Sequence, residues 1–228
     1  MDQLAIVLES FNRKERNLLI RDILGHLPLS SDFCERLAKL AGISKESLES
    51  AWWATDFHFD WLAGALLTFM KGEKQGPQDN ASMVVMGSPE DLDVIVAAHD
   101  PDPKAETRHH LILIEAKAYG YFSTDQYQSK AKRLELLYEF YERLEKESKH
   151  RIRFHYFLLS RTEPTKLVLE PLPWRSGIAT VPKDIHLEIK LPGSSLRVVR
   201  RCDSEGKTNK NGGHWTCDDP LVCEDAGS

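Results

Sequence analysis

Apolar side chains recur at two different spacings along the chain, and each spacing predicts a different type of element. In residues 1–50 they recur every three or four positions, which is typical of amphipathic helices. The same spacing continues through residues 51–72, where Trp53, Phe57 and Trp61 predict one long and mostly buried helix. The earlier helices are expected at "QLAIVLESF", at "RKERNLLIRDILGHL" after a capping-box pair formed by Asn12 and Glu15, and at "DFCERLAKLAGI".

Runs rich in β-branched and aromatic residues predict the strands of a sheet. After the third run, Tyr127, Leu134 and Tyr141 form the apolar stripe of a long amphipathic helix that begins after Ser123 or Thr124 as N-cap. The order of helix, three strands, helix and strand predicts a mixed α/β fold with a helix crossing between strands. The expected strands are "ASMVVMGS", "EDLDVIVAA", "HHLILIEAKAY" and "RIRFHYFLLS", with "HLEIKL" and "SLRVV" as further edge strands.

Composition divides the chain of 228 residues into three parts. Residues 1–50 are expected to form a helical N-terminal extension, and residues 51–200 contain the main sheet. Residues 201–228 are polar enough to form a loosely ordered tail. With 41% hydrophobic residues, the chain can bury a full core.

The net charge, the apolar runs and the cysteines argue against several classes of protein. A net charge of -5 argues against nonspecific coating of nucleic acid, although it is compatible with a local basic cleft. The chain has no apolar run near 18 residues and no signal-peptide pattern at its start, which predicts a soluble, cytoplasmic protein without a membrane partner. Its four cysteines are too few and too unevenly placed for a disulfide framework, so reduced thiols are expected.

Two charged side chains end the third predicted strand. Leu113, Glu115 and Lys117 are spaced by two, so in a strand they share one face. If the preceding strand is a neighbour, Asp93 reaches the same end of the sheet; Asp91 is the alternative, but the aliphatic run starts directly after Asp93. Two carboxylates suit Mg²⁺, with Mn²⁺ as an alternative, and a nearby lysine can hold or deprotonate a water.

In "PEDLDVIVAA", "LILIEAKAY" and the helix that begins "DQYQSKAKRL", the chain resembles the PD-(D/E)XK nuclease superfamily over roughly residues 50–160. The resemblance implies a restriction-endonuclease-like fold: a mixed sheet core flanked by helices. It further implies that Asp93 and Glu115 bind the metal and that Lys117 acts in catalysis. The resemblance also implies a supporting catalytic glutamine, for which Gln126 is the candidate and Gln128 the alternative. It implies a further acidic metal ligand on the helix before the sheet, and Asp60 in "FHFDWLAGAL" is the candidate.

The expected function is therefore Mg²⁺-dependent hydrolysis of phosphodiester bonds in nucleic acid, with DNA as the expected partner. Cutting of both strands by a single-site fold would require a homodimer or two separate nicks. Two other hypotheses stay open. In the first, the chain is a nuclease-fold protein that binds nucleic acid or a protein partner without cutting. In the second, Glu115 and Lys117 form a structural ion pair in an unrelated α/β domain. The second hypothesis would be indicated if Asp93 and Glu115 lay far apart.

Several other polar or aromatic groups have a structural interpretation that is preferred to a functional one. A second acid-x-lysine pair, Glu188 and Lys190, is expected to be an ordinary edge-strand pair because no Asp-led strand precedes it. The preferred interpretations of the remaining groups are core packing for Trp52, Trp53 and Trp61, a polar loop end for His109 and His110, a solvated helix face for Lys130, Lys132 and Arg133, and lone thiols rather than a zinc site for Cys202, Cys217 and Cys223 with His214.

Overall fold

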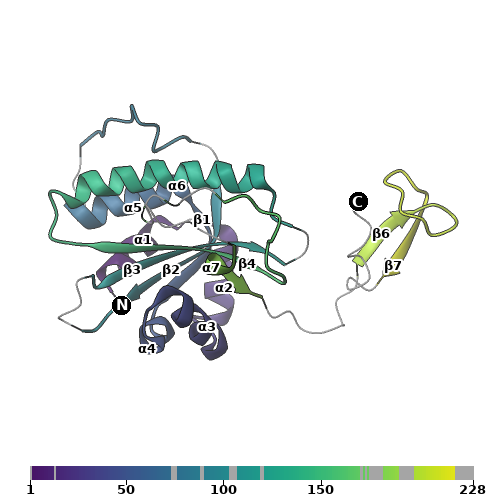
Figure 1. Ribbon diagram of the computed structural model, residues 1–228, viewed down its shortest axis with the longest axis horizontal. Coiled ribbons are helices and arrows are strands. Elements are labelled where there is room, and N and C mark those ends of the chain that lie inside the picture. Colours follow the sequence, from purple (N-terminus) through teal and green to yellow (C-terminus); the bar gives the residue numbers. More distant parts are fainter. Residues whose placement is uncertain are drawn as a thin grey trace. The chain divides into compact units, whose positions relative to one another are not determined.

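The computed structural model separates the chain into two units, Met1–Ile189 and Lys190–Ser228 (Figure 1). The boundary therefore lies after Ile189 and not after residue 200. The structure describes residues 2–12, 14–72, 76–87, 90–102, 107–118, 121–169, 172, 174, 182–189 and 198–218.

The first unit is built on a five-stranded mixed sheet with the order β1-β2-β3-β4-β5. β2 pairs antiparallel with both β1 and β3, whereas β3, β4 and β5 are parallel. The predicted mixed α/β class is confirmed. The strands are β1 (Trp52–His58), β2 (Asp91–His99), β3 (His109–Lys117), β4 (Ile152–Ser160) and β5 (His186–Glu188).

Helices flank this sheet on both sides. Figure 1 shows α5 and α6 side by side along one face, while α3 and α4 lie on the other. The crossover from β3 to the parallel strand β4 is made by α6, as the sequence predicts. The helices are α1 (Gln3–Phe11), α2 (Glu15–Leu24), α3 (Ser31–Ala41), α4 (Lys45–Glu49), α5 (Phe59–Lys71), α6 (Thr124–Glu145) and α7 (Pro182–Ile185).

The core lies on both faces of the central strands. Residues Leu111–Ile114 of β3 are fully buried, which explains why this strand is continuously apolar instead of alternating. From the helical side, Leu62 and Leu66 of α5 are fully buried, and Leu134 of α6 is fully buried as well. The apolar stripe predicted for α6 therefore packs as expected. This packing holds the ends of β2 and β3 in place.

The prediction of one helix over residues 51–72 is wrong in its first half. Trp52 and Ala54 are buried while Trp53 and Thr55 are partly exposed, so burial alternates with a period of two in the first part of β1. The alternation is interrupted at Asp56, whose φ is 53°, and Phe57 is the next buried residue. The helical spacing of the aromatic residues is coincidental, because pairing with β2 supplies the backbone hydrogen bonds of this segment. The helix α5 begins only after His58, whose Nδ1 accepts a hydrogen bond from Asp60 N at 3.2 Å.

Two further local predictions are wrong. Of the expected strand at residues 81–88, the part up to Gly87 is described and forms turns and irregular structure, with the backbone of Met83 at a φ of 55°. The capping box is not formed either, because α2 begins at Glu15 with Lys14 as N-cap, and Asn12 Oδ1 instead accepts a hydrogen bond from Lys14 N at 3.0 Å.

The second unit contains an antiparallel pair of strands, β6 (Val198–Cys202) and β7 (His214–Asp218). The polar tail therefore holds regular structure up to Asp218, where a loosely ordered segment was expected. Val198 and Val199 of the expected strand "SLRVV" lie in β6, and the first three residues of that segment are outside the described ranges. In the part of the chain that the structure describes, Cys34, Cys202 and Cys217 are free thiols, and Cys223 lies outside it.

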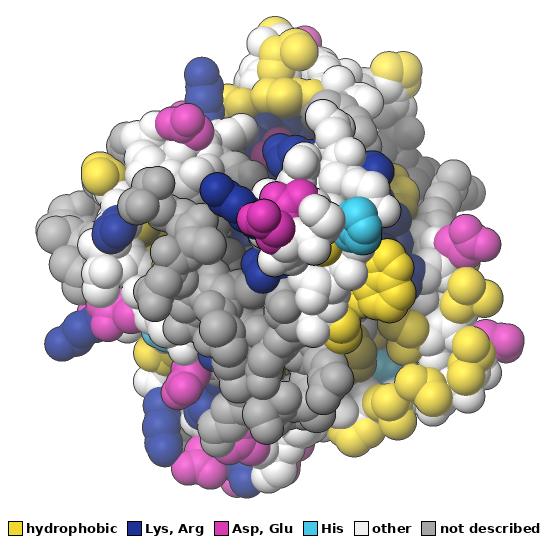
Figure 2. Space-filling model, turned by 90° about the vertical axis from the view of Figure 1, so that its right-hand side faces the viewer, with side chains coloured by type: hydrophobic (Ala, Val, Ile, Leu, Met, Phe, Trp, Pro, Cys, Tyr) yellow, Lys and Arg dark blue, Asp and Glu magenta, His cyan; other side chains and the backbone are white. Residues whose placement is uncertain are grey.

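Two properties of the molecule bear on its partners. None of the helices within the described ranges has the length and apolar composition needed to cross a bilayer. On the face shown in Figure 2, the described Lys and Arg side chains are interspersed with Asp and Glu. The described charges in this view are therefore of both signs.

Candidate functional site

The strands β2 and β3 separate at the end where Asp93 and Glu115 lie. Their pairing is regular up to Val94 opposite Ile114. One position further, the carboxylate of Asp93 crosses to β3 and accepts a hydrogen bond from Ala116 N at 2.7 Å. This bond satisfies a backbone donor and fixes the Asp93 side chain beside Glu115.

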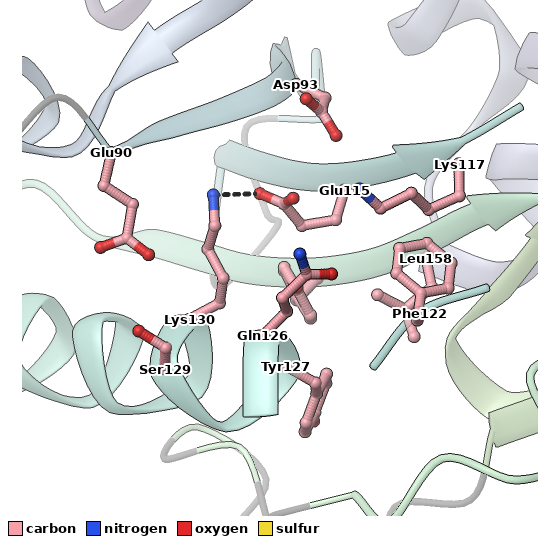
Figure 3. Close-up of a pocket in the computed structure, with 11 residues that line it drawn as sticks. Glu90, Asp93, Glu115, Lys117, Phe122, Gln126, Tyr127, Ser129, Lys130 and Leu158 are labelled. Atoms are coloured by element: carbon pink, nitrogen blue, oxygen red, sulfur yellow. Dashed lines mark hydrogen bonds and ion pairs between the residues drawn. The ribbon is translucent and has the colours of Figure 1, made fainter. Parts of the chain in front are cut away.

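A pocket of about 290 Å³ opens at this end of the sheet (Figure 3). Four of the predicted catalytic residues contribute to its wall: Asp93 from β2, Glu115 and Lys117 from β3, and Gln126 from the first turn of α6. The segments that carry these residues are therefore brought together by the sheet and the crossover helix. The remaining lining residues are Glu90, Phe122, Tyr127, Ser129, Lys130, Tyr156 and Leu158.

Glu115 is the most perturbed acid of this pocket. Its side chain is only 13% exposed and forms an ion pair with Lys130 Nζ at 2.7 Å. Burial raises the pKa of Glu115 to about 7, and the neighbouring Asp93 carboxylate adds to this rise, whereas Lys130 and Lys117 oppose it. The two lysines therefore do not stabilise the ionised form of Glu115 fully, and an additional cation at this position would favour that form.

Lys117 and Gln126 approach the pocket from different elements. Lys117 follows Glu115 by two residues in β3, so both lie on the same strand face. Gln126 is held at the start of α6, where Ser123 caps the helix by accepting a hydrogen bond from Gln126 N at 3.2 Å. Figure 3 shows the Gln126 amide directed from α6 toward Glu115. Gln128 does not line the described pocket, so Gln126 is the better of the two candidates.

The structure also distinguishes Asp93 from Asp91. The Asp91 carboxylate forms an ion pair with Lys14 Nζ at 2.5 Å and is not among the described residues that line the pocket. Asp93 lines the pocket directly. Asp93 and Glu115 line the same pocket. The hypothesis of a structural ion pair in an unrelated domain expected these two carboxylates to lie far apart, and they do not. The ion pair of Glu115 is formed with Lys130 and not with Lys117.

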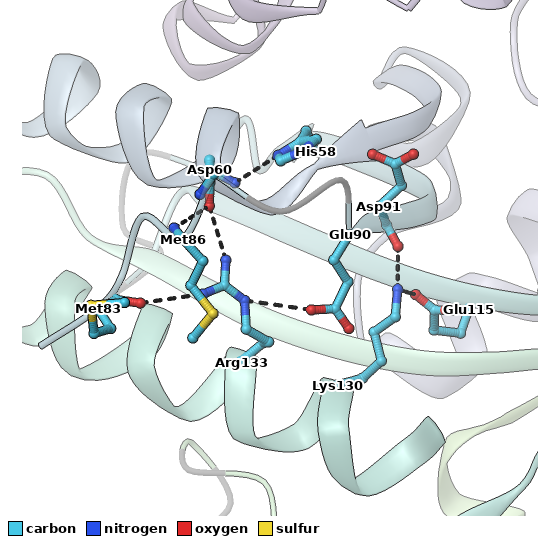
Figure 4. Close-up of polar contacts among 10 residues, drawn as sticks. His58, Asp60, Met83, Met86, Glu90, Asp91, Glu115, Lys130 and Arg133 are labelled. Atoms are coloured by element: carbon cyan, nitrogen blue, oxygen red, sulfur yellow. Dashed lines mark hydrogen bonds and ion pairs between the residues drawn. The ribbon is translucent and has the colours of Figure 1, made fainter. Parts of the chain in front are cut away.

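Asp60, the predicted third metal ligand, is occupied elsewhere (Figure 4). One of its oxygens accepts hydrogen bonds from Arg133 Nη2 at 3.0 Å and from Met86 N at 3.1 Å. The other accepts a hydrogen bond from Gly87 N at 2.7 Å. Asp60 therefore ties the loop before β2 to α5 and α6, and it is not among the described pocket residues.

Glu90 and Lys130 line the pocket but were not predicted as site residues. Glu90 stands three residues before Asp93 and lies 3.6 Å from Arg133 Nε. Lys130 donates hydrogen bonds to Glu115 and to the backbone carbonyl of Asp91. A helical spacing of four from Gln126 is the sequence signal that places Lys130 on the same side of α6.

The prediction of a solvated face for the cations of α6 is wrong for two of three residues. The side chains of Lys130 and Arg133 are only 16% and 5% exposed and form ion pairs, whereas Lys132 is exposed. His110 is not at a polar loop end either. It is buried in β3, where its Nδ1 lies 3.2 Å from His155 Nε2 of β4.

The tryptophans have the expected packing role. Trp52 is buried in the core, and Trp61 packs edge-on against Phe57 with 6.0 Å between ring centroids. Trp53 donates a hydrogen bond to Leu27 O at 2.8 Å. Glu188 of the second acid-x-lysine pair lies exposed in β5, the last strand of the sheet, and Lys190 falls outside the described residues.

Groups of three potential metal ligands are rare in the described part of the chain. Asp2, His99 and His109 form such a group, with ligand atoms within 4.8 Å of one another. The carboxylates of the pocket do not form a set of three at this distance, and neither do Cys202, His214 and Cys217 among the residues described in the second unit. A cation in the pocket would therefore rely on Asp93 and Glu115, with water or a substrate phosphate as further ligands.

Comparison of the chain with protein-family models, with curated proteins and with solved structures found no match. The functional argument therefore depends on the pocket itself.

Proposed function

We propose that this protein is a Mg²⁺-dependent nuclease with a restriction-endonuclease-like core and a PD-(D/E)XK-type active site. The observation that carries the proposal is the convergence of Asp93, Glu115, Lys117 and Gln126 on one pocket. These residues come from two neighbouring strands and the following helix. The resemblance implies this grouping, and chance occurrence of a short acid-x-lysine motif would not require it.

The pocket fits a small divalent cation. Asp93 and Glu115 supply two carboxylates, and Glu90 supplies a third acidic group on the wall. The raised pKa of Glu115 indicates that its negative charge lacks full compensation in the protein alone. Asp93 and Glu115 would hold such a cation, which would supply positive charge next to a bound phosphodiester.

The protein side chains would perform the remaining tasks. Lys117 is the candidate group that holds the attacking water or accepts its proton, because it lies next to the metal-binding carboxylates. Gln126 would orient that water through its amide. Lys130 contributes positive charge at the same pocket, which suits the approach of a phosphate.

Cleavage of labelled single- and double-stranded DNA and RNA with Mg²⁺ or Mn²⁺ tests this proposal, with DNA as the expected substrate. Lys117→Ala should lower the cleavage rate by roughly 100-fold or more while leaving the fold intact, as judged by circular dichroism. Glu188→Ala is the matched control, because Glu188 lies in β5 and is the acid of the second acid-x-lysine pair, and the cleavage rate of this variant should be unchanged. Equal rates for Lys117→Ala and the unaltered protein would remove Lys117 from the mechanism.

A nuclease-fold protein that binds nucleic acid without cutting is the second candidate. The ion pair between Lys130 and Glu115 favours it, because this lysine already neutralises part of the charge that a metal would need. Nucleic-acid or Mg²⁺ binding without cleavage of any of the four substrates would support this candidate over the nuclease.

A further inference from the structure

A second group of titratable side chains lies at the other end of the same two strands. His99 is the last residue of β2 and pairs directly with His109, the first residue of β3. Asp93 and His99 are six residues apart in β2, so this end of the sheet is about 20 Å from the proposed nuclease site. The two groups are therefore separate sites.

The third member of the group comes from the start of the chain. Asp2 occupies the N-cap position of α1, yet its side chain makes no capping hydrogen bond. The carboxylate turns instead to His109, with 3.1 Å between Asp2 Oδ2 and His109 Nδ1. Both side chains are largely buried, with exposed fractions of 13% and 14%. The sequence does not require this contact, because the two residues are 107 positions apart.

Donor chemistry and spacing are suited to a metal ion. Two imidazoles and one carboxylate each offer a ligand atom, and these three atoms lie within 4.8 Å of one another. In a tetrahedral zinc site, donors about 2.0–2.1 Å from the ion are about 3.3 Å apart, so small side-chain rotations would close the group. Nitrogen donors favour zinc and related transition metals, whereas Mg²⁺ prefers oxygen.

A further imidazole stands close to the group. His150 stands beside the group, with its ring centroid 6.1 Å from that of His109. His150 is therefore adjacent to the group, while the donor atoms that lie within 4.8 Å of one another belong to Asp2, His99 and His109.

We propose that Asp2, His99 and His109 form a zinc-binding site, with His150 adjacent, that fastens the start of α1 to the β2–β3 end of the sheet. The bound ion would be held by residues from three separate segments. Because the folded chain brings these donors together, zinc binding would stabilise the folded state.

The test is zinc titration of the full chain, free of any added histidine tag and of prior metal. Calorimetry should detect binding of one Zn²⁺ per chain in the presence of saturating Mg²⁺. His99→Gln, His109→Gln and the milder Asp2→Asn should each weaken this binding at least about tenfold. His26→Gln, at an exposed histidine of the same chain, and Asp93→Asn, in the distant pocket, are the matched controls and should bind zinc as the unaltered protein does.

Two readouts keep the test informative if a histidine variant folds poorly. Co²⁺ added to the unaltered protein should give a visible absorption spectrum of tetrahedral type that Zn²⁺ abolishes, and Zn²⁺ should raise the melting temperature. A folded chain that binds no zinc, or zinc binding lost in Asp93→Asn and retained in Asp2→Asn and His99→Gln, would overturn the proposal. Neither result depends on whether the protein cleaves nucleic acid.

Discussion

Two buried acids of this protein receive their counter-charges from one face of α6. Glu115 pairs with Lys130, and Asp60 pairs with Arg133. Lys130 and Arg133 are three residues apart and therefore neighbours on the helix surface. The difference between the two acids lies in their remaining contacts: Asp60 also accepts two backbone N–H groups, whereas Glu115 faces the pocket. Under the proposed function, Glu115 is therefore the better candidate of the two acids for binding a cation.

The raised pKa of Glu115 predicts a pH-dependent stability. Its pKa is about 7 in the folded chain and 4.5 in the unfolded chain, so the folded state binds more protons between these values. The contribution of Glu115 to the free energy of unfolding should therefore be highest below pH 4.5. This contribution should fall by about 3 kcal/mol as the pH rises to 7. Urea unfolding in EDTA between pH 5 and pH 8 measures this change.

The matched variant for this prediction is Glu115→Gln, which carries a neutral side chain of similar shape at all pH values. Its free energy of unfolding should decrease less between pH 5 and pH 7 than that of the unaltered protein. Added Mg²⁺ should restore stability at pH 8 only when Glu115 is present, since the metal favours the ionised carboxylate. Identical pH profiles for both proteins would contradict the assignment.

Among the elements, α1 depends on a glycine of α5. The two helices pack against each other, and a Cβ at Gly64 would lie 2.7 Å from Cε1 of the Phe11 ring. This close approach explains a glycine inside a helix, where alanine would otherwise be favoured by about 1 kcal/mol. The contact also holds α1 in the position from which Asp2 reaches His109.

A double-mutant cycle tests the helix contact. In a Phe11→Ala background, Gly64→Ala should stabilise the protein by up to about 1 kcal/mol, because only the helix propensity changes. In the unaltered background the ring must move, so the same substitution should be less favourable, with a coupling of about 1–2 kcal/mol. Thermal and urea unfolding of the four proteins measure it, and additive effects would mean that the ring yields at no cost.

For the molecule as a whole, the separation into two units indicates which residues contain the sheet and the two proposed sites. All five strands of the mixed sheet and every residue that lines the proposed nuclease pocket lie within Met1–Ile189. So do the three ligands of the proposed zinc site. A two-stranded sheet such as that of β6 and β7 is only marginally stable alone, so it is not expected to support the larger unit.

A chain that ends at Ile189 should therefore fold by itself. We expect one cooperative unfolding transition with a melting temperature within about 3 °C of that of the full chain. Cleavage activity and zinc stoichiometry, where the full chain shows them, should be retained. Calorimetry and circular dichroism of the two chains provide the comparison. An unfolded or aggregated shorter chain would show that residues after Ile189 belong to the folding unit.

Local sequence patterns were sufficient for much of the framework. The apolar runs of β2, β3 and β4, the stripe of α6, and the shared face of Glu115 and Lys117 follow from periods of two and 3.6 residues, which depend only on neighbouring positions. The prediction of a helix in the segment that forms β1 was wrong. Aromatic residues recur there every four positions, but the backbone hydrogen bonds of this segment are formed with β2.

The pocket partners and the ligands of the proposed zinc site could be identified only from the folded chain. The ion pair of Lys130 with Glu115, the loss of Asp60 to Arg133, the position of Glu90 and the meeting of Asp2 with His109 each join segments that are separate in the sequence. Strand order and register decide which of these side chains meet. Periodicity within a segment carries no information about either, because it records which face a residue occupies and not which segment lies against that face.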